Sequence, residues 1–288
     1  MRLLDTIKSS SDYLEKSGVA DPLVDAELLV LHAAGIDRLR AYMDNPEANW
    51  RLLSRINRLV KRRAAGEPLQ YIIGHVDFLG LEIRVGKGVL IPRPETELLV
   101  EEAIKIVKRN ALSLKSSEKH PSAFLDLCTG SGCIALVLAR EFPDAKVYAT
   151  DVSAKAVKCA MGNAEHNTIG NVTFLKGSLF TPVEEHMPFD LITANPPYIS
   201  TSDISGLQRE VREWEPLRAL DGGEDGLDFY RKILAKAAGY LKEGGWIFFE
   251  LGFGQSEAVT ETAADAGFKN IELIKDFAGI NRVLKAEK

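Results

Sequence analysis

The chain has 288 residues, of which 45% are hydrophobic, and a formal net charge of −5. This length predicts two domains, or one large domain with an appendage, and the composition suffices for a globular core. The acidic balance argues against a dedicated nucleic-acid binder, so we expect no direct nucleic-acid partner. The cysteines form no CxxC pair, which argues against disulfides and a zinc site, and we expect no metal. Because no apolar run has membrane-spanning length and "MRLLDTIKSS" lacks a signal-peptide core, we expect a cytoplasmic soluble protein without a membrane partner.

A helical domain is predicted for residues 1–75. The stretch "DAELLVLHAAGIDRLRAYM" has apolar residues at helical spacing. Asp21 followed by Pro22 predicts the start of this helix, and Gly35 predicts a C-terminal cap. A second helix is predicted for "NWRLLSRINRLVKRRAAG", which carries an apolar stripe and a basic stripe. The basic stripe is either a solvated helix face or a binding surface, and it consists of Arg51, Arg55, Arg58 and Arg62.

The pattern changes between Gly66 and about Glu97, where Ile, Val, aromatic residues and Gly alternate in places. This change predicts a short β-hairpin and a loop, and we place a hairpin and linker at residues 76–97. The next stretch, "TELLVEEAIKIVKRNAL", predicts an amphipathic helix. A polar linker is predicted for "SLKSSEKHPSA".

Residues 98–288 are predicted to form an α/β domain. Helical patterns separate the first five of seven strand-like runs and precede the sixth; these runs are "AFLDLCT", "AKVYATD", "NVTFLKG", "FDLITAN", "GWIFFEL", "NIELIKD" and "NRVLKAE". Such alternation indicates a mostly parallel sheet covered on both faces. Only "FAGI" separates the last two runs, so they must pair antiparallel, because a parallel pair needs a crossover. This count is typical of the class I S-adenosylmethionine-dependent methyltransferase fold rather than of an NAD dehydrogenase.

A glycine-containing loop, "DLCTGSGCIAL", follows the first of these strands and opens a helix. Gly130 and Gly132 remove side chains where the chain turns, so that a ligand can approach the backbone. Ala135 occupies the position of a third glycine, which weakens a pyrophosphate-binding interpretation. Asp151 ends the second strand about twenty residues beyond the loop, where a carboxylate can accept hydrogen bonds from ribose hydroxyls.

These features together predict a nucleoside ligand without phosphates, and S-adenosyl-L-methionine fits that description. Taken separately, the two glycines could form a plain tight turn and Asp151 could cap a helix. Ligands of such sheets bind outside the carboxyl ends of the parallel strands, where the strand order reverses. The glycine loop is then one wall of the crevice, and the end of the fourth strand is another.

That fourth strand ends in "LITANPPYIS", in which two prolines must stop the ladder of the sheet. An amide nitrogen is a poor nucleophile because its lone pair is delocalised, but two acceptors that hold both N–H bonds can aim the lone pair at a methyl donor. The side-chain oxygen of Asn195 and the carbonyl of Pro196 are adjacent acceptors. The Tyr198 ring can pack on the flat substrate group or face the cationic donor. No general base is required, because the product nitrogen loses a proton once it has become acidic, and the motif contains no carboxylate or histidine. The structural alternative is mere strand termination.

The glycine loop and "NPPY" resemble methyltransferases that act on exocyclic or amide nitrogen. The chain is identified as similar to the HemK/PrmC family, the protein-(glutamine-N5) methyltransferases of peptide chain release factors, by "GEPLQYIIGHVDFLGLEIRVGKGVLIPRPETELLVEEA", "DLCTGSGCIAL", "NPPYIS", "EVREWEPLRALDGGEDGLDFYRKIL" and "GGWIFFELGFGQ". The resemblance covers nearly the whole chain. It implies methylation of the glutamine amide in the Gly-Gly-Gln loop of release factors. It also implies that the N-terminal helical domain helps dock this substrate, and we expect a monomer.

The resemblance also implies where the family's site residues fall in this sequence. The ribose acid falls on Asp151, and the segment "KGSLF" should flank the adenine through backbone contacts near Ser178 and Leu179. The cofactor loop falls on Cys128, Thr129, Gly130, Ser131 and Gly132. The substrate-amide corner, which also adjoins the cofactor through Asn195, falls on Asn195, Pro196, Pro197 and Tyr198.

A segment that packs over the active site in the family contains Arg93, Pro94, Glu95 and Thr96. Arg93 and Glu95 are expected to bind the substrate or else only to order this loop. Phe78 is either a wall of the pocket or part of the hairpin core.

Other functions stay open at this point. The nearest is methylation of a glutamine in a ribosomal protein. A DNA adenine-N6 methyltransferase would need a basic target-reading domain, which the chain lacks apart from the stripe between Arg51 and Arg62. A non-enzymatic cofactor-binding scaffold is disfavoured by the intact glycine loop, Asp151 and "NPPY".

Overall fold

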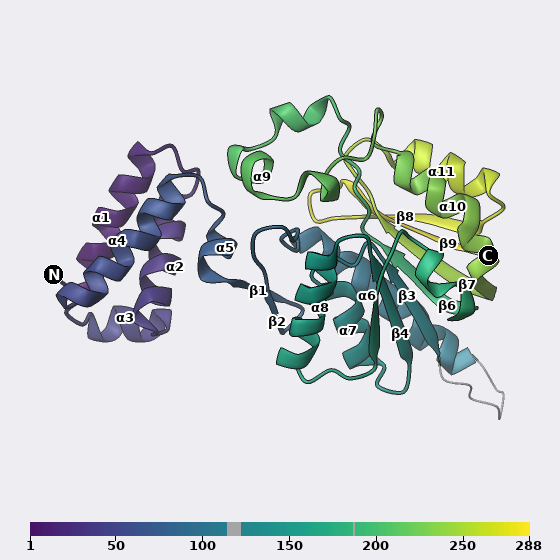
Figure 1. The fold of residues 1–288 in the computed structure, drawn as a ribbon, viewed down its shortest axis with the longest axis horizontal. Helices are drawn as coiled ribbons and strands as arrows, with labels where there is room; N and C mark the ends of the chain where they lie inside the picture. Colours follow the sequence, from purple (N-terminus) through teal and green to yellow (C-terminus); the bar gives the residue numbers. More distant parts are fainter. Residues whose placement is uncertain (114–121, 187) are drawn as a thin grey trace. The chain divides into compact units, whose positions relative to one another are not determined.

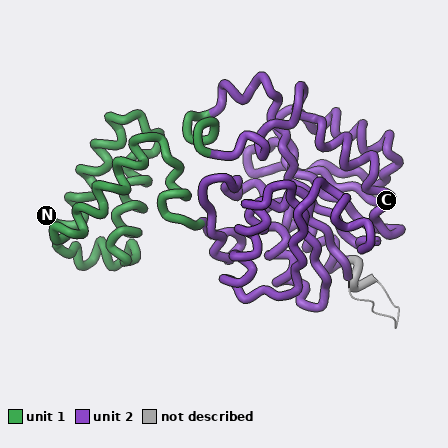
Figure 2. The backbone as a smooth tube through the Cα atoms, in the orientation of Figure 1, with its two compact units in different colours: residues 1–75, 208–214 green, residues 76–207, 215–288 purple. Residues whose placement is uncertain are grey.

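The computed structural model describes residues 1–113, 122–186 and 188–288 in two compact units (Figures 1 and 2). Unit 1 consists of Met1–His75 and Gln208–Trp214, and unit 2 consists of Val76–Leu207 and Glu215–Lys288. The sequence placed residues 208–214 in the methyltransferase domain, whereas their packing groups them with the N-terminal helices. Within the described residues, no helix combines the length and the apolar character needed to cross a membrane.

Unit 1 is helical and has its own apolar core. The predicted ends of helix α2 (Pro22–Ala34) are confirmed, because Asp21 precedes this helix and Gly35 ends it with φ +67°. The apolar stripe predicted near Ile56 faces the shared core, where Leu29 and Val30 also lie. Its helices are α1 (Leu3–Lys16), α2 (Pro22–Ala34), α3 (Arg38–Asp44), α4 (Trp50–Ala64), α5 (Leu69–Ile73) and α9 (Arg209–Trp214).

Helix α5 was not expected, because its sequence "LQYII" is rich in β-branched residues that favour strands. Pro68 stands at its start, and Gly74 ends it with φ +96°. Leu69, Tyr71 and Ile72 are buried in the short helix. Burial of this apolar cluster therefore outweighs the local strand propensity, and the predicted hairpin begins only after Gly74.

Unit 2 is built on a seven-stranded sheet in the order β5-β4-β3-β6-β7-β9-β8 (Figure 1). The strands are β3 (Ala123–Leu127), β4 (Lys146–Asp151), β5 (Val172–Lys176), β6 (Phe189–Ala194), β7 (Leu241–Glu250), β8 (Lys269–Lys275) and β9 (Asn281–Glu287). The first five run parallel, and β9 pairs antiparallel with both β7 and β8. The predicted strand count and the antiparallel final pair are confirmed.

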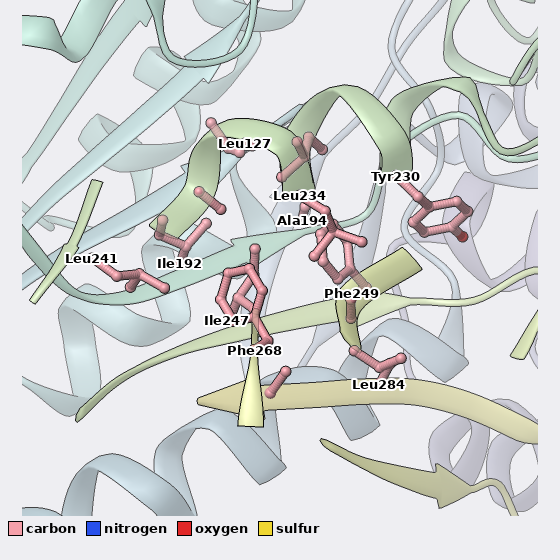
Figure 3. Close-up of a cluster of buried hydrophobic side chains, with 14 of the residues drawn as sticks. Leu127, Ile192, Ala194, Tyr230, Leu234, Leu241, Ile247, Phe249, Phe268 and Leu284 are labelled. Carbon is pink, nitrogen blue, oxygen red and sulfur yellow. The ribbon is translucent and has the colours of Figure 1, made fainter. Parts of the chain in front are cut away.

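Helices cover both faces of this sheet. Helices α10 (Asp228–Tyr240) and α11 (Ser256–Asp265) pack on one face, where Figure 3 shows Tyr230 and Leu234 against Phe249. Residues that alternate with this set along the strands, such as Phe248, are also buried and point to the other face. Three further helices contact the sheet: α6 (Pro94–Ser113), α7 (Cys133–Glu141) and α8 (Ala154–His166). Helix α6 contacts β6, β7 and β9, whereas α7 and α8 contact β4 and β5.

Smaller elements lie in the remaining connections. Strands β1 (His75–Phe78) and β2 (Leu81–Arg84) form the predicted hairpin. Between β5 and β6 the chain forms the 3₁₀ turn η1 (Thr181–His186) instead of the α-helical pattern expected there, and Pro182 falls within it. The turns η2 (Asp203–Gly206) and η3 (Leu217–Ala219) flank α9. Most of the predicted polar linker lies outside the described residues.

Candidate active site

A cavity of about 240 Å³ lies in unit 2 where the parallel strands end. Strands β4, β3 and β6 are parallel neighbours, so their carboxyl ends meet at one edge of the sheet. The cavity wall includes Gly130 after β3, Asp151 at the end of β4, Leu179 after β5 and Asn195 after β6. Segments that were singled out separately in the sequence therefore surround one cavity.

The two glycines of the loop after β3 have different surroundings. Gly130 has φ +57°, and a Cβ at this position would meet no atom closer than 3.9 Å, so the backbone here is open to the cavity. Gly132 has φ +84°, and a Cβ there would lie 2.9 Å from the Cβ of Ala160 in α8. Gly132 thus permits close packing of α8, and it is not among the described residues of the cavity wall. The wall does include Cys128, Thr129, Gly130 and Ser131.

Beneath this loop lies a buried carboxylate, Asp126, that the sequence analysis did not single out. Its Oδ2 accepts a hydrogen bond from the Thr129 hydroxyl at 2.6 Å, and its Oδ1 accepts one from the Thr193 hydroxyl at 2.9 Å. Burial raises the pKa of Asp126 to about 7, although both hydroxyls favour the ionised form. Because Thr129 is in the loop and Thr193 is in β6, Asp126 joins the glycine loop to the strand that carries Asn195.

Asp151 lies on the cavity wall at the end of β4. Its Oδ2 accepts a hydrogen bond from the Gly130 backbone N–H at 3.0 Å, and its Oδ1 accepts one from Ser153 N–H at 2.7 Å. Burial raises its pKa, while these two bonds and the charge of Arg218 oppose that change. Arg218 also lines the cavity, from η3. The acid therefore has a structural role at the loop in addition to facing the cavity.

Ser178 and Leu179 line the cavity beyond β5, as does Gly177. Leu179 has the left-handed φ of +48°, which is uncommon for a residue with a side chain. Its carbonyl accepts a hydrogen bond from the Thr150 hydroxyl at 3.0 Å. The backbone of this segment is thus fixed by β4, next to the expected position of an adenine ring.

The Asn195 amide is held from one side only. Its Nδ2 donates to Glu250 Oε2 at 2.8 Å and to Thr96 Oγ1 at 3.2 Å. Its Oδ1 accepts no hydrogen bond from the described residues, and it is not among their buried unpaired polar atoms, so it is exposed. No donor within the described part of the chain reaches the Pro196 carbonyl. Both acceptors that the sequence assigned to an amide substrate are therefore unpaired.

A carboxylate from outside the motif, Glu250, also belongs to this corner. It ends β7, the strand that pairs with β6, and it is buried. Besides Asn195, it accepts hydrogen bonds from the Thr96 hydroxyl at 2.5 Å and from the Tyr198 hydroxyl at 3.2 Å. Burial raises the pKa of Glu250, against the effect of these hydroxyls. The signal in the sequence was an acid closing the apolar run "WIFFEL".

Of the other residues of the Asn-Pro-Pro-Tyr corner, only one is among the described residues of the cavity wall. Pro197 lines the cavity, whereas Pro196 and Tyr198 are not among its described wall residues. Tyr198 packs against the core cluster shown in Figure 3, and burial raises the pKa of its phenol. Its hydroxyl, directed at Glu250, therefore stays protonated and acts as a donor.

Arg93 and Glu95 lie outside the described cavity wall, but their neighbour Thr96 is part of it. The Arg93 guanidinium contacts Glu215 Oε1 at 2.5 Å, and Ile91 N–H donates to Glu215 Oε2 at 3.1 Å. This pairing orders the loop that precedes α6. Phe78, in β1, is only 1% exposed and is not among the described residues of the cavity wall.

Solved structures share the fold of this chain at low identity. The N-terminal domain of human METTL16, in complex with SAH, is 20% identical with a TM-score of 0.53, over 79% of this chain and 83% of that chain. A methyltransferase from Pyrococcus furiosus is 21% identical with a TM-score of 0.51, over 82% and 98%. Together with the observed strand order, these similarities confirm the class I methyltransferase fold.

Sequence comparisons are more specific. Residues 5–74 match the PrmC N-terminal domain, and residues 107–209 match the methyltransferase small domain. The release factor glutamine methyltransferase of Thermodesulfovibrio yellowstonii is 47% identical over 264 residues, 92% of this chain and 92% of the relative. That of Geobacter sulfurreducens is 44% identical over 277 residues, 94% and 92%. Since this similarity extends through both units, the chain belongs to the family of release factor glutamine methyltransferases.

Proposed function

We propose that this enzyme transfers a methyl group from S-adenosyl-L-methionine to the side-chain amide nitrogen of the glutamine in the Gly-Gly-Gln loop of peptide chain release factors. The observation that carries the proposal is the corner at Asn195. Asn195, whose Oδ1 is unpaired, lines the same cavity as the glycine loop and Asp151, and the next residue, Pro196, has an unpaired carbonyl. Family membership supplies the class of substrate.

The cavity suits the cofactor. Asp151 has two carboxylate oxygens that each accept one backbone N–H, and each keeps capacity for a further donor such as a ribose hydroxyl. Apolar wall residues, among them Ile134 and Leu179, suit an adenine ring and an aliphatic chain. The open backbone at Gly130 suits the amino-acid end of the ligand. When bound, S-adenosyl-L-methionine supplies a methyl group on a sulfonium that is open to nucleophilic attack.

The chain's own part in the transfer is to hold and polarise the amide. Asn195 Oδ1 and the Pro196 carbonyl accept the two N–H bonds of the glutamine side chain, which turns the nitrogen lone pair toward the methyl donor. As positive charge grows on this nitrogen, the two fixed oxygens stabilise it without reorganisation. The product nitrogen loses a proton once it has become acidic, so no base has to act first.

Recognition of the whole release factor is assigned to unit 1. A single amide cannot distinguish one protein from another, so binding energy has to come from surface away from the chemistry. Unit 1 has its own core and an exposed α4 face that carries Trp50, 74% exposed, beside Arg51, Arg55 and Arg58. Arg62, the fourth member of the predicted stripe, is instead paired with Glu67. We also propose that the enzyme acts as a monomer and in the cytoplasm.

Mass spectrometry of three candidate substrates tests the proposal. Purified enzyme and S-adenosyl-L-methionine are incubated in parallel with release factor, ribosomal protein and DNA, and the site of any added methyl group is mapped. We expect one methyl group on the glutamine of the Gly-Gly-Gln loop. Methylation of the ribosomal protein or of adenine, with the release factor unmodified, would reassign the substrate; no transfer to any of them would refute the proposal.

A further inference from the structure

Three hydrogen-bond donors converge on the carboxylate of Glu250. Thr96 and Asn195 donate to Oε2, at 2.5 and 2.8 Å, and Tyr198 donates to Oε1 at 3.2 Å. The donors come from α6 and from the corner after β6, while Glu250 comes from β7. Glu250 itself is buried and does not belong to the described cavity wall. It therefore acts from behind the corner and not on the substrate.

An asparagine amide has two orientations, related by a half-turn, that exchange its oxygen and its NH2 group. An ionised carboxylate accepts hydrogen bonds and cannot donate one, so it attracts the NH2 group and repels the oxygen. Because Nδ2 of Asn195 faces Glu250, Oδ1 has to point the other way. Three donors face the Glu250 carboxylate and favour its ionised form, against the burial that raises its pKa. Its charge then selects the orientation in which Asn195 presents an acceptor to the cavity.

Thr96 reinforces this selection. Its hydroxyl has a single proton, which it donates to Glu250, so toward Asn195 it can only accept. Asn195 Nδ2 therefore faces two acceptors, the Glu250 carboxylate and the Thr96 hydroxyl. The hydroxyl is an acceptor here because its proton is donated to Glu250. Without that negative charge, the Thr96 hydroxyl could rotate and donate, and the reversed amide would find a partner.

We propose that Glu250 is a positioning residue for methyl transfer, whose carboxylate locks the Asn195 amide with Oδ1 toward the substrate nitrogen. This inference rests on the proposed function, because it assumes that Oδ1 of Asn195 accepts from the amide being methylated. A reversed amide would present N–H donors to the substrate N–H bonds and would hold the nitrogen in the wrong place. Misplacement of reacting groups by about 1 Å can cost about a hundredfold in rate.

The first test replaces the acid by its isosteric amide. The glutamine of Glu250→Gln can place either its oxygen or its NH2 group toward Asn195. The Asn195 amide is then no longer restricted to one orientation. We expect kcat for release factor to fall about ten- to a hundredfold. The dissociation constant for S-adenosyl-L-methionine and the KM for release factor should change little, because Glu250 lines neither surface.

A reciprocal exchange separates orientation from simple structural support. Asn195→Asp alone sets two carboxylates against each other, and we expect it to lower kcat by about a hundredfold or more. In the double variant with Glu250→Gln, the amide stands at position 250 and donates to the carboxylate at position 195. The second oxygen of that carboxylate is then directed at the cavity. The double variant should therefore be about tenfold or more faster than Asn195→Asp, although it carries one more substitution.

Asp190→Asn provides the matched control. Asp190 lies near the opposite end of β6, where it pairs with Lys242 at 2.8 Å and accepts from Ala123 N–H at 2.8 Å. The same acid-to-amide change there should leave kcat unchanged. Thermal unfolding and cofactor titration of every variant confirm that the fold and the cavity persist.

The wild-type enzyme must first methylate release factor; if it does not, the proposed function fails and not this inference. Given that activity, a Glu250→Gln variant as fast as wild type would overturn the positioning role. So would a double variant no faster than Asn195→Asp. If Glu250→Gln left kcat unchanged, as is expected of Asp190→Asn, and lowered only the thermal stability, Glu250 would be a structural residue only.

Discussion

Asp151 accepts a hydrogen bond from the backbone N–H of Gly130, with 3.0 Å between Oδ2 and the nitrogen. The end of β4 is thereby tied to the loop after β3, across the edge of the sheet where the cavity lies. A side chain that was expected to bind ribose therefore also fixes the loop that the ligand meets. Each of its oxygens keeps capacity for another donor, so the two roles are compatible.

Asp151→Ala should weaken S-adenosyl-L-methionine binding by roughly one to two orders of magnitude. Hydrogen bonds to a charged acceptor contribute about 1.5–3 kcal/mol, and the variant also releases the Gly130 loop. Calorimetric titration of the cofactor measures the change. Asp265→Ala, at an exposed position at the end of α11, is the control. Equal affinity in both variants would mean that the Asp151 carboxylate does not bind the cofactor.

Asn195→Ala should lower kcat by about a hundredfold to a thousandfold while cofactor affinity stays nearly intact. Loss of one preorganised group of this kind costs roughly 2.7–4 kcal/mol in the transition state. Single-turnover methylation of release factor gives the rate, and cofactor titration gives the affinity. Ser202→Ala, an exposed position beyond the corner, should retain the wild-type rate. Unchanged turnover in the Asn195 variant contradicts the paired-acceptor mechanism.

Asp126 gives stability a pH dependence. Burial raises its pKa from 3.8 to about 7, so between those values the folded protein holds a proton that the unfolded chain releases. This group therefore makes the free energy of unfolding fall as pH rises from about 4 to about 7, and has no further effect above that, with a total of up to about 4 kcal/mol.

Asp126→Asn is neutral at every pH, so it should gain stability relative to wild type between pH 4 and pH 8. Urea unfolding of both proteins across that range measures the difference, and comparison with wild type cancels the other titrating groups. The new amide can still bond both threonine hydroxyls, because a hydroxyl accepts as well as donates. A difference that stays constant with pH would show that Asp126 is ionised throughout.

The exposed arginines of α4 should act on association. Replacing Arg51, Arg55 and Arg58 by Gln should slow binding of release factor and flatten its salt dependence, because surface charges steer encounter. The kcat at saturating substrate should not change. Replacing Lys8, Lys16 and Arg40 by Gln removes equal charge elsewhere on unit 1 and is the control. Equal effects of the two sets on the association rate would reduce the stripe to a solvated face.

The sequence predicted the architecture well where local signals agree with burial. Alternating strands and helices predicted the sheet of unit 2, and Asp21 and Gly35 marked the ends of α2. It could not predict that β9 enters between β7 and β8, because that order depends on packing and not on local pattern. Helix α5 was missed because burial of its apolar side chains outweighed β-branched propensity.

The sequence predicted several residues that line the cavity, but it did not predict Glu250, which holds Asn195. Motifs marked the glycine loop, Asp151 and Asn195 because each stands at a strand end. Glu250 is 55 residues from Asn195 in sequence, and only the pairing of β6 with β7 brings the two together. Arg93 and Glu215 are 122 residues apart in sequence, and their contact likewise comes from tertiary packing. Such partners depend on tertiary packing, which the sequence did not specify.

Helix α9 has a consequence for how the two units can be taken apart. Its Glu210 pairs with Arg63 of α4, whose guanidinium also contacts Asp25. A shortened chain that starts at residue 76 would thus carry a stretch whose packing partners had been removed. The boundary between the units is interleaved, and no single cut in the gene separates them.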